Sequence, residues 1–297
     1  MSSETKTINE TKLRADLKKV CNLAYKKGLL SGFDGNLSLK INNELILITP
    51  QGSHKGTLKE EDFVLVDING NTISNGNKQP SSEIDTHLEV YEKRKDISAF
   101  IHCHPPTVVS LTIAGIPINF PIVPDVVLSL GEIPTLSYPG QDKKTEAELT
   151  VNCLEKHDVM VLEKHGAVTI GKNIFNALYK MELLEHQCKI IHTARVLGEM
   201  KTLNKKEIKE LGDLRQEPNL FQEHYDPCTL KSVFTKLFNS DSPVFQRVLD
   251  LTNELINLTV SQTSYAQKLS IEEKENLSRE LTASLINIFL GRFTGKK

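Results

Sequence analysis

A hairpin signal within an alternation of strand and helix patterns most restricts the fold of this chain. Residues 63–74, FVLVDINGNTIS, place two runs rich in β-branched residues around an Asn-Gly pair, the turn that two-residue hairpins prefer. Further strand patterns at 44–49, 97–104 and 158–171 alternate with helix patterns. We expect a mixed α/β domain of three αβα layers, because hairpins do not occur in a purely parallel, doubly wound sheet.

Apolar residues at helical spacing predict five helices. They cover residues 10–30, 81–94, 107–115, 145–156 and 173–199. The stretch between the third and fourth is rich in Pro and Gly, and we expect loops with short strands there. Ser81 or Ser82 would cap the second helix, and Thr57 with Glu60 predicts a capping box before a short helical turn.

The pattern changes after about residue 212. Pro243 stands at a first-turn position, and Ser270 with Glu273 forms another capping box before an apolar stripe. We therefore expect a main domain over 10–212. A helical extension over 213–297 would pack on that domain or on a neighbouring subunit.

Composition restricts the partners and the compartment. The formal net charge of −2 gives no electrostatic footprint for a nucleic acid or an anionic membrane. The N-terminus lacks the apolar core of a signal peptide, and no apolar run approaches the ~20 residues of a spanning helix. Five scattered cysteines are an odd number, which is typical of reduced thiols. We expect a cytoplasmic protein.

His102 and His104 give the most specific chemical signal. Alternate side chains of a strand share a face, so both imidazoles point one way and Cys103 points the other. Two imidazoles on one face can chelate a divalent ion, since neutral imidazole is a common ligand of zinc. The alternative is a pair of partly exposed histidines at a strand end.

Two further residues gain meaning from that pair. His165 precedes a glycine in a second strand turn, EKHGAV, and a third imidazole would leave one tetrahedral position open for substrate. Glu83 follows two serines at a predicted helix start, where free N–H groups attract an anion such as phosphate. The alternative for each residue alone is that His165 is an ordinary turn histidine and that Glu83 is part of an acidic first turn of a helix. His87, one turn after Glu83, is interpreted as a packing or outer residue.

Five stretches together resemble the class II aldolase/adducin family, in particular its L-fuculose-1-phosphate aldolases. They are GFDGNLSLK (32–40), LITPQGSHKG (47–56), PSSEIDTHLEVY (80–91), AFIHCHPP (99–106) and VLEKHGAVTIG (161–171). They follow the family's order and cover roughly residues 10–200. The resemblance implies a mixed sheet with helices on both sides, assembled as a cyclic homotetramer with active sites between subunits.

The resemblance also implies a metal centre. Zinc, or another divalent transition metal, would be held by His102, His104 and His165. Glu83 would be the fourth group, a ligand in the resting state and the catalytic base when substrate displaces it. The implied reaction cleaves a ketose 1-phosphate into dihydroxyacetone phosphate and an aldehyde through a metal-stabilised enediolate.

The substrate implied is a phosphorylated sugar, with no nucleic-acid or membrane partner. Its phosphate would be bound by four residues: Asn36, Gly52, Ser81 and Ser82.

Three features depart from the family pattern. Phe33 stands where the aldolases can offer a threonine, and Asp34 would repel a phosphate unless Lys55 offsets its charge. The loop IPINFPIVPDVV lacks the tyrosine that the aldolases use as proton donor, so Tyr138 or Tyr225 would have to replace it. The extension after residue 212 lies where the family closes its active site.

Other functions use the same fold. A sugar-phosphate 4-epimerase tends to carry Asp where this chain has Glu83, which favours the aldolase. A decarboxylase or dehydratase of a sugar-acid or ketose phosphate also depends on a metal-stabilised enolate. A non-catalytic, adducin-like binding module would be marked by loss of the metal residues, and the three histidines and Glu83 are all present.

Overall fold

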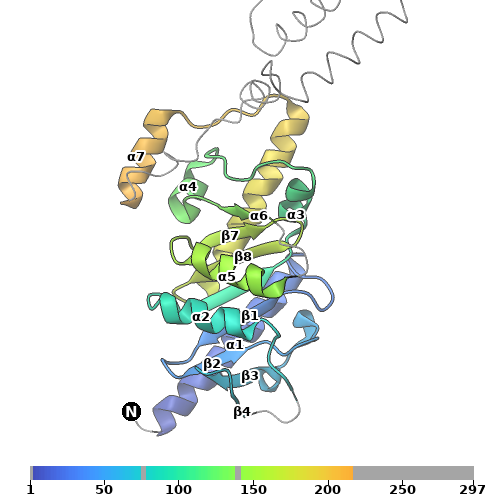
Figure 1. Ribbon diagram of the computed structural model, residues 1–297, viewed down its shortest axis with the longest axis vertical. Coiled ribbons are helices and arrows are strands. Elements are labelled where there is room, and N and C mark those ends of the chain that lie inside the picture. The colour runs from blue at the N-terminus through green and yellow to red at the C-terminus, as the bar shows by residue number, and fades with distance from the viewer. Residues whose placement is uncertain (1–2, 75–77, 138–141, 217–297) are drawn as a thin grey trace, which may run out of the picture. The chain divides into compact units, whose positions relative to one another are not determined.

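The described part of the chain is built on one mixed sheet. The computed structural model describes residues 3–74, 78–137 and 142–216 (Figure 1). Its strands are β1 (Asn36–Lys40), β2 (Leu45–Ile48), β3 (Val64–Asp67), β4 (Thr72–Ser74), β5 (Ala99–Cys103), β6 (Thr135–Leu136), β7 (Val159–Leu162) and β8 (Gly166–Gly171). Their order across the sheet is β4-β3-β2-β1-β5-β8-β7-β6. The described neighbours pair antiparallel except β6 and β7, which are parallel, so the predicted mixed sheet and the hairpin at 63–74 are confirmed.

Helices cover both faces of this sheet. They are α1 (Ser3–Lys26), α2 (Ile84–Lys93), α3 (Pro106–Ile113), α4 (Pro124–Leu130), α5 (Lys143–Leu154), α6 (Ile174–Leu197) and α7 (Lys205–Arg215), with the 3-10 turns η1 (Lys55–Thr57) and η2 (Glu60–Asp62). Helices α2 and α5 lie together on one face, and α1 and α6 pack on the other (Figure 1). The predicted three layers are therefore confirmed. Among the described helices, none has the length and apolarity required to cross a membrane.

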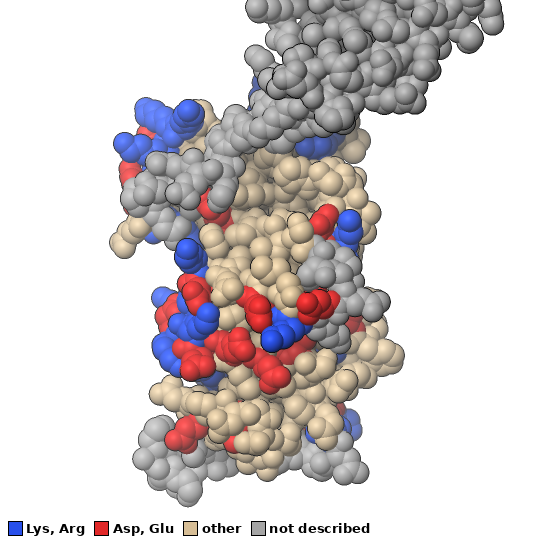
Figure 2. All heavy atoms as spheres, viewed as in Figure 1, with Lys and Arg blue, Asp and Glu red and all other residues tan. Residues whose placement is uncertain are grey.

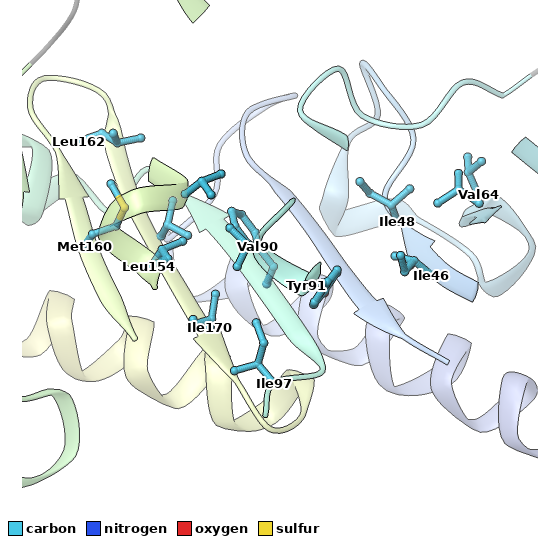
Figure 3. Close-up of a cluster of buried hydrophobic side chains, with 14 residues drawn as sticks. Ile46, Ile48, Val64, Val90, Tyr91, Ile97, Leu154, Met160, Leu162 and Ile170 are labelled. Carbon is cyan, nitrogen blue, oxygen red and sulfur yellow. The ribbon is translucent and has the colours of Figure 1, made fainter. Parts of the chain in front are cut away.

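The core between the sheet and the α2/α5 layer fixes which way β5 faces. Figure 3 shows part of this core, where Val90 of α2, Leu154 of α5 and Ile170 of β8 lie together. Phe100 of β5 belongs to the same buried cluster. Because side chains of a strand alternate, the residue two positions after Phe100 must also face α2 and α5. That residue is His102.

The predicted serine cap of α2 is wrong. The helix begins at Ile84 with Glu83 in the N-cap position, and the side chain of Glu83 makes no capping hydrogen bond. Ser81 precedes the cap: its backbone N–H donates to the carbonyl of Thr49 at 3.1 Å, and its hydroxyl accepts from the backbone N–H of Glu83 at 3.4 Å. The bond to Thr49 ties the two serines to the end of β2, so they precede the helix and leave Glu83 at its start.

The predicted capping box of Thr57 and Glu60 is also wrong. Thr57 ends η1, and its hydroxyl donates back to the carbonyl of His54 at 3.1 Å. The carboxylate of Asp62 accepts from the backbone N–H of Lys59 at 2.7 Å, which places the N-cap of η2 at Lys59, two residues after Thr57. A local hydrogen bond of the threonine hydroxyl therefore competes with the expected cap.

Two differences concern domain limits and loops. The stretch expected to form loops contains α4, which Pro124 opens at a first-turn position and whose Val126, Val127 and Leu130 are buried. The extension expected over 213–297 falls almost wholly outside the described residues, including its capping residues Ser270 and Glu273. Its boundary at residue 212 stays a prediction.

Candidate metal centre

His102 and His104 lie at the end of β5, in the centre of the sheet. His102 pairs with Asn36 of β1 on one side and with Val168 of β8 on the other. The two imidazole rings have centroids 5.0 Å apart, while Cys103 is buried on the opposite face. The expected same-face arrangement of the two histidines is confirmed.

His165 completes a triangle of imidazoles. It lies in the turn between β7 and β8, where Lys164 adopts a φ of 60°. Its ring centroid is 4.8 Å from that of His102 and 4.9 Å from that of His104. One nitrogen from each of the three rings lies within 4.8 Å of the other two. Three segments far apart in sequence therefore place three nitrogen donors around one point.

The donor set fits a divalent cation. Nε2 of His102 and Nε2 of His104 are buried and have no hydrogen-bond partner among the described residues. Buried polar atoms of this kind are costly unless something satisfies them. Burial and the two neighbouring imidazoles lower the pKa of His104 to about 3, which keeps it neutral at pH 7. Neutral imidazole nitrogens that converge on one point are what zinc and similar ions bind.

Glu83 stands beside the triangle. Its Oε2 accepts a hydrogen bond from Nδ1 of His102 at 2.8 Å, so the neutral form of that ring carries its lone pair on Nε2. Burial would raise the pKa of Glu83, but the His102 charge and hydrogen bonds from His102 and Asn36 outweigh it and hold the pKa well below its usual range. Glu83 is therefore a carboxylate at neutral pH, available as a ligand or a base.

A buried hydrogen-bond chain behind Glu83 could not be seen in the sequence. Nε2 of His87 lies 2.6 Å from Oδ1 of Asn36, and Nδ1 lies 2.6 Å from the hydroxyl of Ser38, which in turn meets Tyr91. Burial lowers the pKa of His87 to about 3, so its ring is neutral and donates to Asn36. The amide of Asn36 then donates to Glu83. His87 thus occupies the outer position that we expected, with both ring nitrogens engaged.

Three of the four residues expected at the phosphate lie in neighbouring loops, and Asn36 begins β1. The backbone N–H of Gln51 donates to Gln79 at 3.0 Å, which brings 49–52 and 79–82 side by side. Gly52 has a φ of +63° and borders a hollow with Lys78, and Ser82 borders the cavity next to the imidazoles. The carboxamide of Asn36 faces His87 and Glu83. The structure thus brings the segments of Gly52, Ser81 and Ser82 together and engages Asn36 elsewhere.

The cavity beside the imidazoles is acidic. Its volume is about 920 Å³, and it lies between α2, α5 and the ends of β5 and β8. Acidic side chains gather on this face (Figure 2). The charged residues that line the cavity are Glu83, Asp85, Glu89, Glu146, Glu148, Lys144 and Lys164. Five carboxylates against two ammonium groups give this cavity a negative potential.

The departures noted in the sequence have distinct positions. Phe33 is exposed, while Lys55 is buried and donates to the carbonyl of Phe33 at 2.9 Å. Burial lowers the pKa of Lys55, and the charge of Asp34 is among those that raise it again. Tyr138 and Tyr225 lie outside the described residues.

Gly166 allows β8 to approach the metal centre closely. A Cβ at this position would lie 2.4 Å from the carbonyl oxygen of Cys103 and 3.2 Å from Nε2 of His102. We expect Gly166→Ala to push β8 away from β5, lower the thermal midpoint and weaken metal binding. In Gly115→Ala, the Cβ meets open space, and only the left-handed backbone (φ +66°) adds a cost of about 1–2 kcal/mol. Thermal unfolding without metal and zinc titration of both variants test this; equal effects would contradict it.

Comparison with known proteins agrees with this geometry. The class II aldolase and adducin N-terminal domain matches residues 15–192. The L-fuculose phosphate aldolase of Methanococcus vannielii is 36% identical over 174 residues, which are 59% of this chain and 92% of that protein. The 3-oxo-tetronate 4-phosphate decarboxylase of Pectobacterium atrosepticum is 31% identical over 203 residues, 67% of this chain and 91% of that protein.

Solved structures agree on the fold. An L-fuculose 1-phosphate aldolase superposes with a TM-score of 0.60 at 28% identity, covering 73% of this chain and 98% of that chain. The match of sequence and fold extends over the region that carries all three imidazoles and Glu83. This chain belongs to the class II aldolase and adducin family.

Proposed function

We propose that this protein is a zinc-type, divalent-metal-dependent aldolase that cleaves a ketose 1-phosphate, similar to L-fuculose 1-phosphate, into dihydroxyacetone phosphate and an aldehyde. The observation that carries the proposal is the triangle of His102, His104 and His165 with the carboxylate of Glu83 bonded to its edge. Relatives named as L-fuculose phosphate aldolases support this substrate class.

The three imidazoles would hold the ion, and Glu83 would move the proton. Cleavage removes a proton from the hydroxyl next to the scissile carbon–carbon bond, and that hydroxyl carbon leaves as the aldehyde. The bonding electrons stay on the other fragment as an enediolate, whose carbon then takes a proton from the carboxyl group of Glu83. Glu83 is ionised and adjacent to the imidazoles, as a base for the first step must be. A bound divalent ion would supply Lewis-acid stabilisation of the negative charge.

The phosphate would be bound by the loops at 49–52 and 79–82, with Gly52, Ser81 and Ser82 as its contacts. The two loops are joined by backbone hydrogen bonds, and Gly52 allows a phosphate to approach the backbone closely. Asn36 was expected as a fourth contact. Its bonds to His87 and Glu83 favour a role in holding Glu83 instead.

The acidic cavity favours an aldolase over the alternative, a decarboxylase of a 3-oxo acid phosphate. A decarboxylase substrate carries a carboxylate at the end remote from its phosphate. Five carboxylates around the cavity would repel such a group, whereas an aldehyde arm with hydroxyl groups is neutral and can donate hydrogen bonds to them. Because a relative from Pectobacterium atrosepticum is named as such a decarboxylase, the test includes its substrate class.

We also infer a catalytic domain over residues 10–212, a helical extension over 213–297 and a homotetramer with active sites between subunits. The match of the family domain to residues 15–192 supports the domain limits. The tetramer and a cytoplasmic location rest on the family likeness and on composition.

A substrate panel tests the function. Purified protein loaded with zinc is given ketose 1-phosphates, pentulose 5-phosphates and 3-oxo-tetronate 4-phosphate, each with and without a chelator. We expect chelator-sensitive release of dihydroxyacetone phosphate from a ketose 1-phosphate. Carbon dioxide release from the 3-oxo acid without that activity would establish the decarboxylase instead. An epimer formed without fragments would also exclude the aldolase.

A further inference from the structure

Asp34 lies beside the imidazole of His104, a contact that the sequence does not predict. Its Oδ2 is 3.4 Å from Nδ1 of His104. Its other oxygen, Oδ1, accepts from the backbone N–H of Ser31 at 2.7 Å. The two oxygens therefore face different partners, one in the loop itself and one on the metal-facing ring.

The loop that carries Asp34 is fixed at both ends against the histidine strand. Before it, the carbonyl of Leu29 accepts from the backbone N–H of His104 at 3.0 Å, and after it Asn36 pairs with His102. Between them Gly35, with a φ of +65°, is pressed so close that a Cβ would lie 2.6 Å from the carbonyl oxygen of His102. These contacts fix the position of the Asp34 carboxylate beside His104.

Lys55 stabilises the same loop through a hydrogen bond to its backbone. It is only 3% exposed, and its ammonium group donates to the carbonyl of Phe33, the residue before Asp34. A buried ammonium group requires a nearby counter-charge. Asp34 is one of several groups whose charge raises the pKa of Lys55 against the larger lowering by burial. Lys55 thus restrains the backbone next to Asp34.

We propose that Asp34 is a positioning residue of the metal centre, a carboxylate that orients His104 through Nδ1 so that Nε2 points at the ion. A metal-binding histidine commonly donates its other N–H to a carboxylate, and such partners raise metal affinity. Glu83 contacts Nδ1 of His102 more closely, in a hydrogen bond of 2.8 Å, whereas Asp34 makes a charge contact with His104 at 3.4 Å. Asp34, unlike Glu83, does not line the 920 Å³ cavity, so its role is tested on metal affinity and not on turnover.

Glu146 makes a similar contact with another ring, since its Oε1 lies 3.1 Å from Nδ1 of His165. Unlike Asp34, however, it lines the cavity, so its removal changes the substrate space as well as the ring. Asp34 is therefore the carboxylate whose role can be tested on the metal alone.

The test measures zinc affinity by competition with a chromophoric chelator in Asp34→Asn, which keeps the shape and removes the charge. We expect a loss of about 10- to 100-fold, a changed visible spectrum of the cobalt-loaded protein, and an unchanged thermal midpoint without metal. Asp125→Asn, which alters an exposed carboxylate in the first turn of α4, should keep wild-type affinity. Zinc affinity within twofold of wild type in Asp34→Asn would overturn the proposal, as would a loss matched by a lower metal-free midpoint.

A double-mutant cycle tests the part played by Lys55. If Lys55 acts through Asp34, the double variant carrying Asp34→Asn and Lys55→Met should lose no more zinc affinity than the single variant that binds zinc more weakly. Fully additive losses would overturn this coupling. The inference rests on the proposed metal centre, and the failures are distinguishable. Wild-type protein that binds no zinc contradicts the metal centre, whereas wild-type binding with unaltered Asp34→Asn contradicts only the positioning role.

Discussion

Glu83→Gln is expected to lower kcat by about 10²- to 10⁴-fold, the usual contribution of a positioned general base. The amide keeps the size of the side chain but has no lone pair basic enough to take a proton. Its one oxygen can still accept from Nδ1 of His102, and the side chain keeps its volume, so the fold should persist. The measurement is steady-state cleavage of the substrate found in the panel, with zinc content determined on the same samples.

The matched control is Glu92→Gln, an exposed glutamate of the same helix. It removes one negative charge from α2 without touching the imidazoles, and kcat should stay within about threefold of wild type. If both Glu83→Gln and Glu92→Gln keep the wild-type kcat, a group other than Glu83 takes the proton. Loss of zinc from Glu83→Gln would instead indicate that this carboxylate acts mainly as a ligand.

His104→Ala is expected to reduce bound zinc from about one ion per chain to none after dialysis, and to abolish turnover with it. A catalytic zinc site depends on three protein ligands, and two imidazoles alone bind weakly. The loss of affinity should exceed about 100-fold, the upper end of what loss of an outer partner costs. His104 is the suitable ring to remove, because its side chain is 25% exposed whereas that of His102 is 2% exposed.

His186→Ala provides the control, because His186 is an exposed histidine on α6. Zinc content by elemental analysis and the metal-free thermal midpoint are measured for both variants. We expect His186→Ala to bind zinc as wild type does. A full complement of zinc in His104→Ala would show that the ion binds elsewhere and that the triangle of imidazoles is not its site.

Much of the fold was predictable because its signals are local. The Asn-Gly hairpin, the alternation around His102 and the amphipathic pattern at 173–199 each depend on residues adjacent in sequence. The corrections have a common cause. Ser81 and Thr57 are residue types that cap helices, but neither is the N-cap residue: the backbone of Ser81 is bonded to Thr49 two residues before Glu83, and the hydroxyl of Thr57 is bonded to His54. Competition among hydrogen bonds cannot be read from composition.

The candidate site was predictable in its inner part and not in its outer part. The three histidines carry a recognisable spacing and context. In contrast, the contacts of Glu83 with His102 and of His87 with Asn36 depend on how α2 packs on the sheet, and that of Asp34 with His104 depends on how the loop before β1 lies against β5. The pairing of Asn36 with His102 places both residues beside α2, and no sequence pattern specifies that register.

The orientation of Cys103 decides which metals the centre can tell apart. Strand alternation turns its sulfur to the α1/α6 face, and burial raises its pKa well above the usual range, so it stays a protonated thiol. The ion would then meet only nitrogen and oxygen donors, without the soft thiolate that selects copper(I) or zinc. Such a set binds manganese, iron, cobalt and zinc in an order set by the ions themselves. Which of them fills the site in a cell would depend on the supply of each free ion.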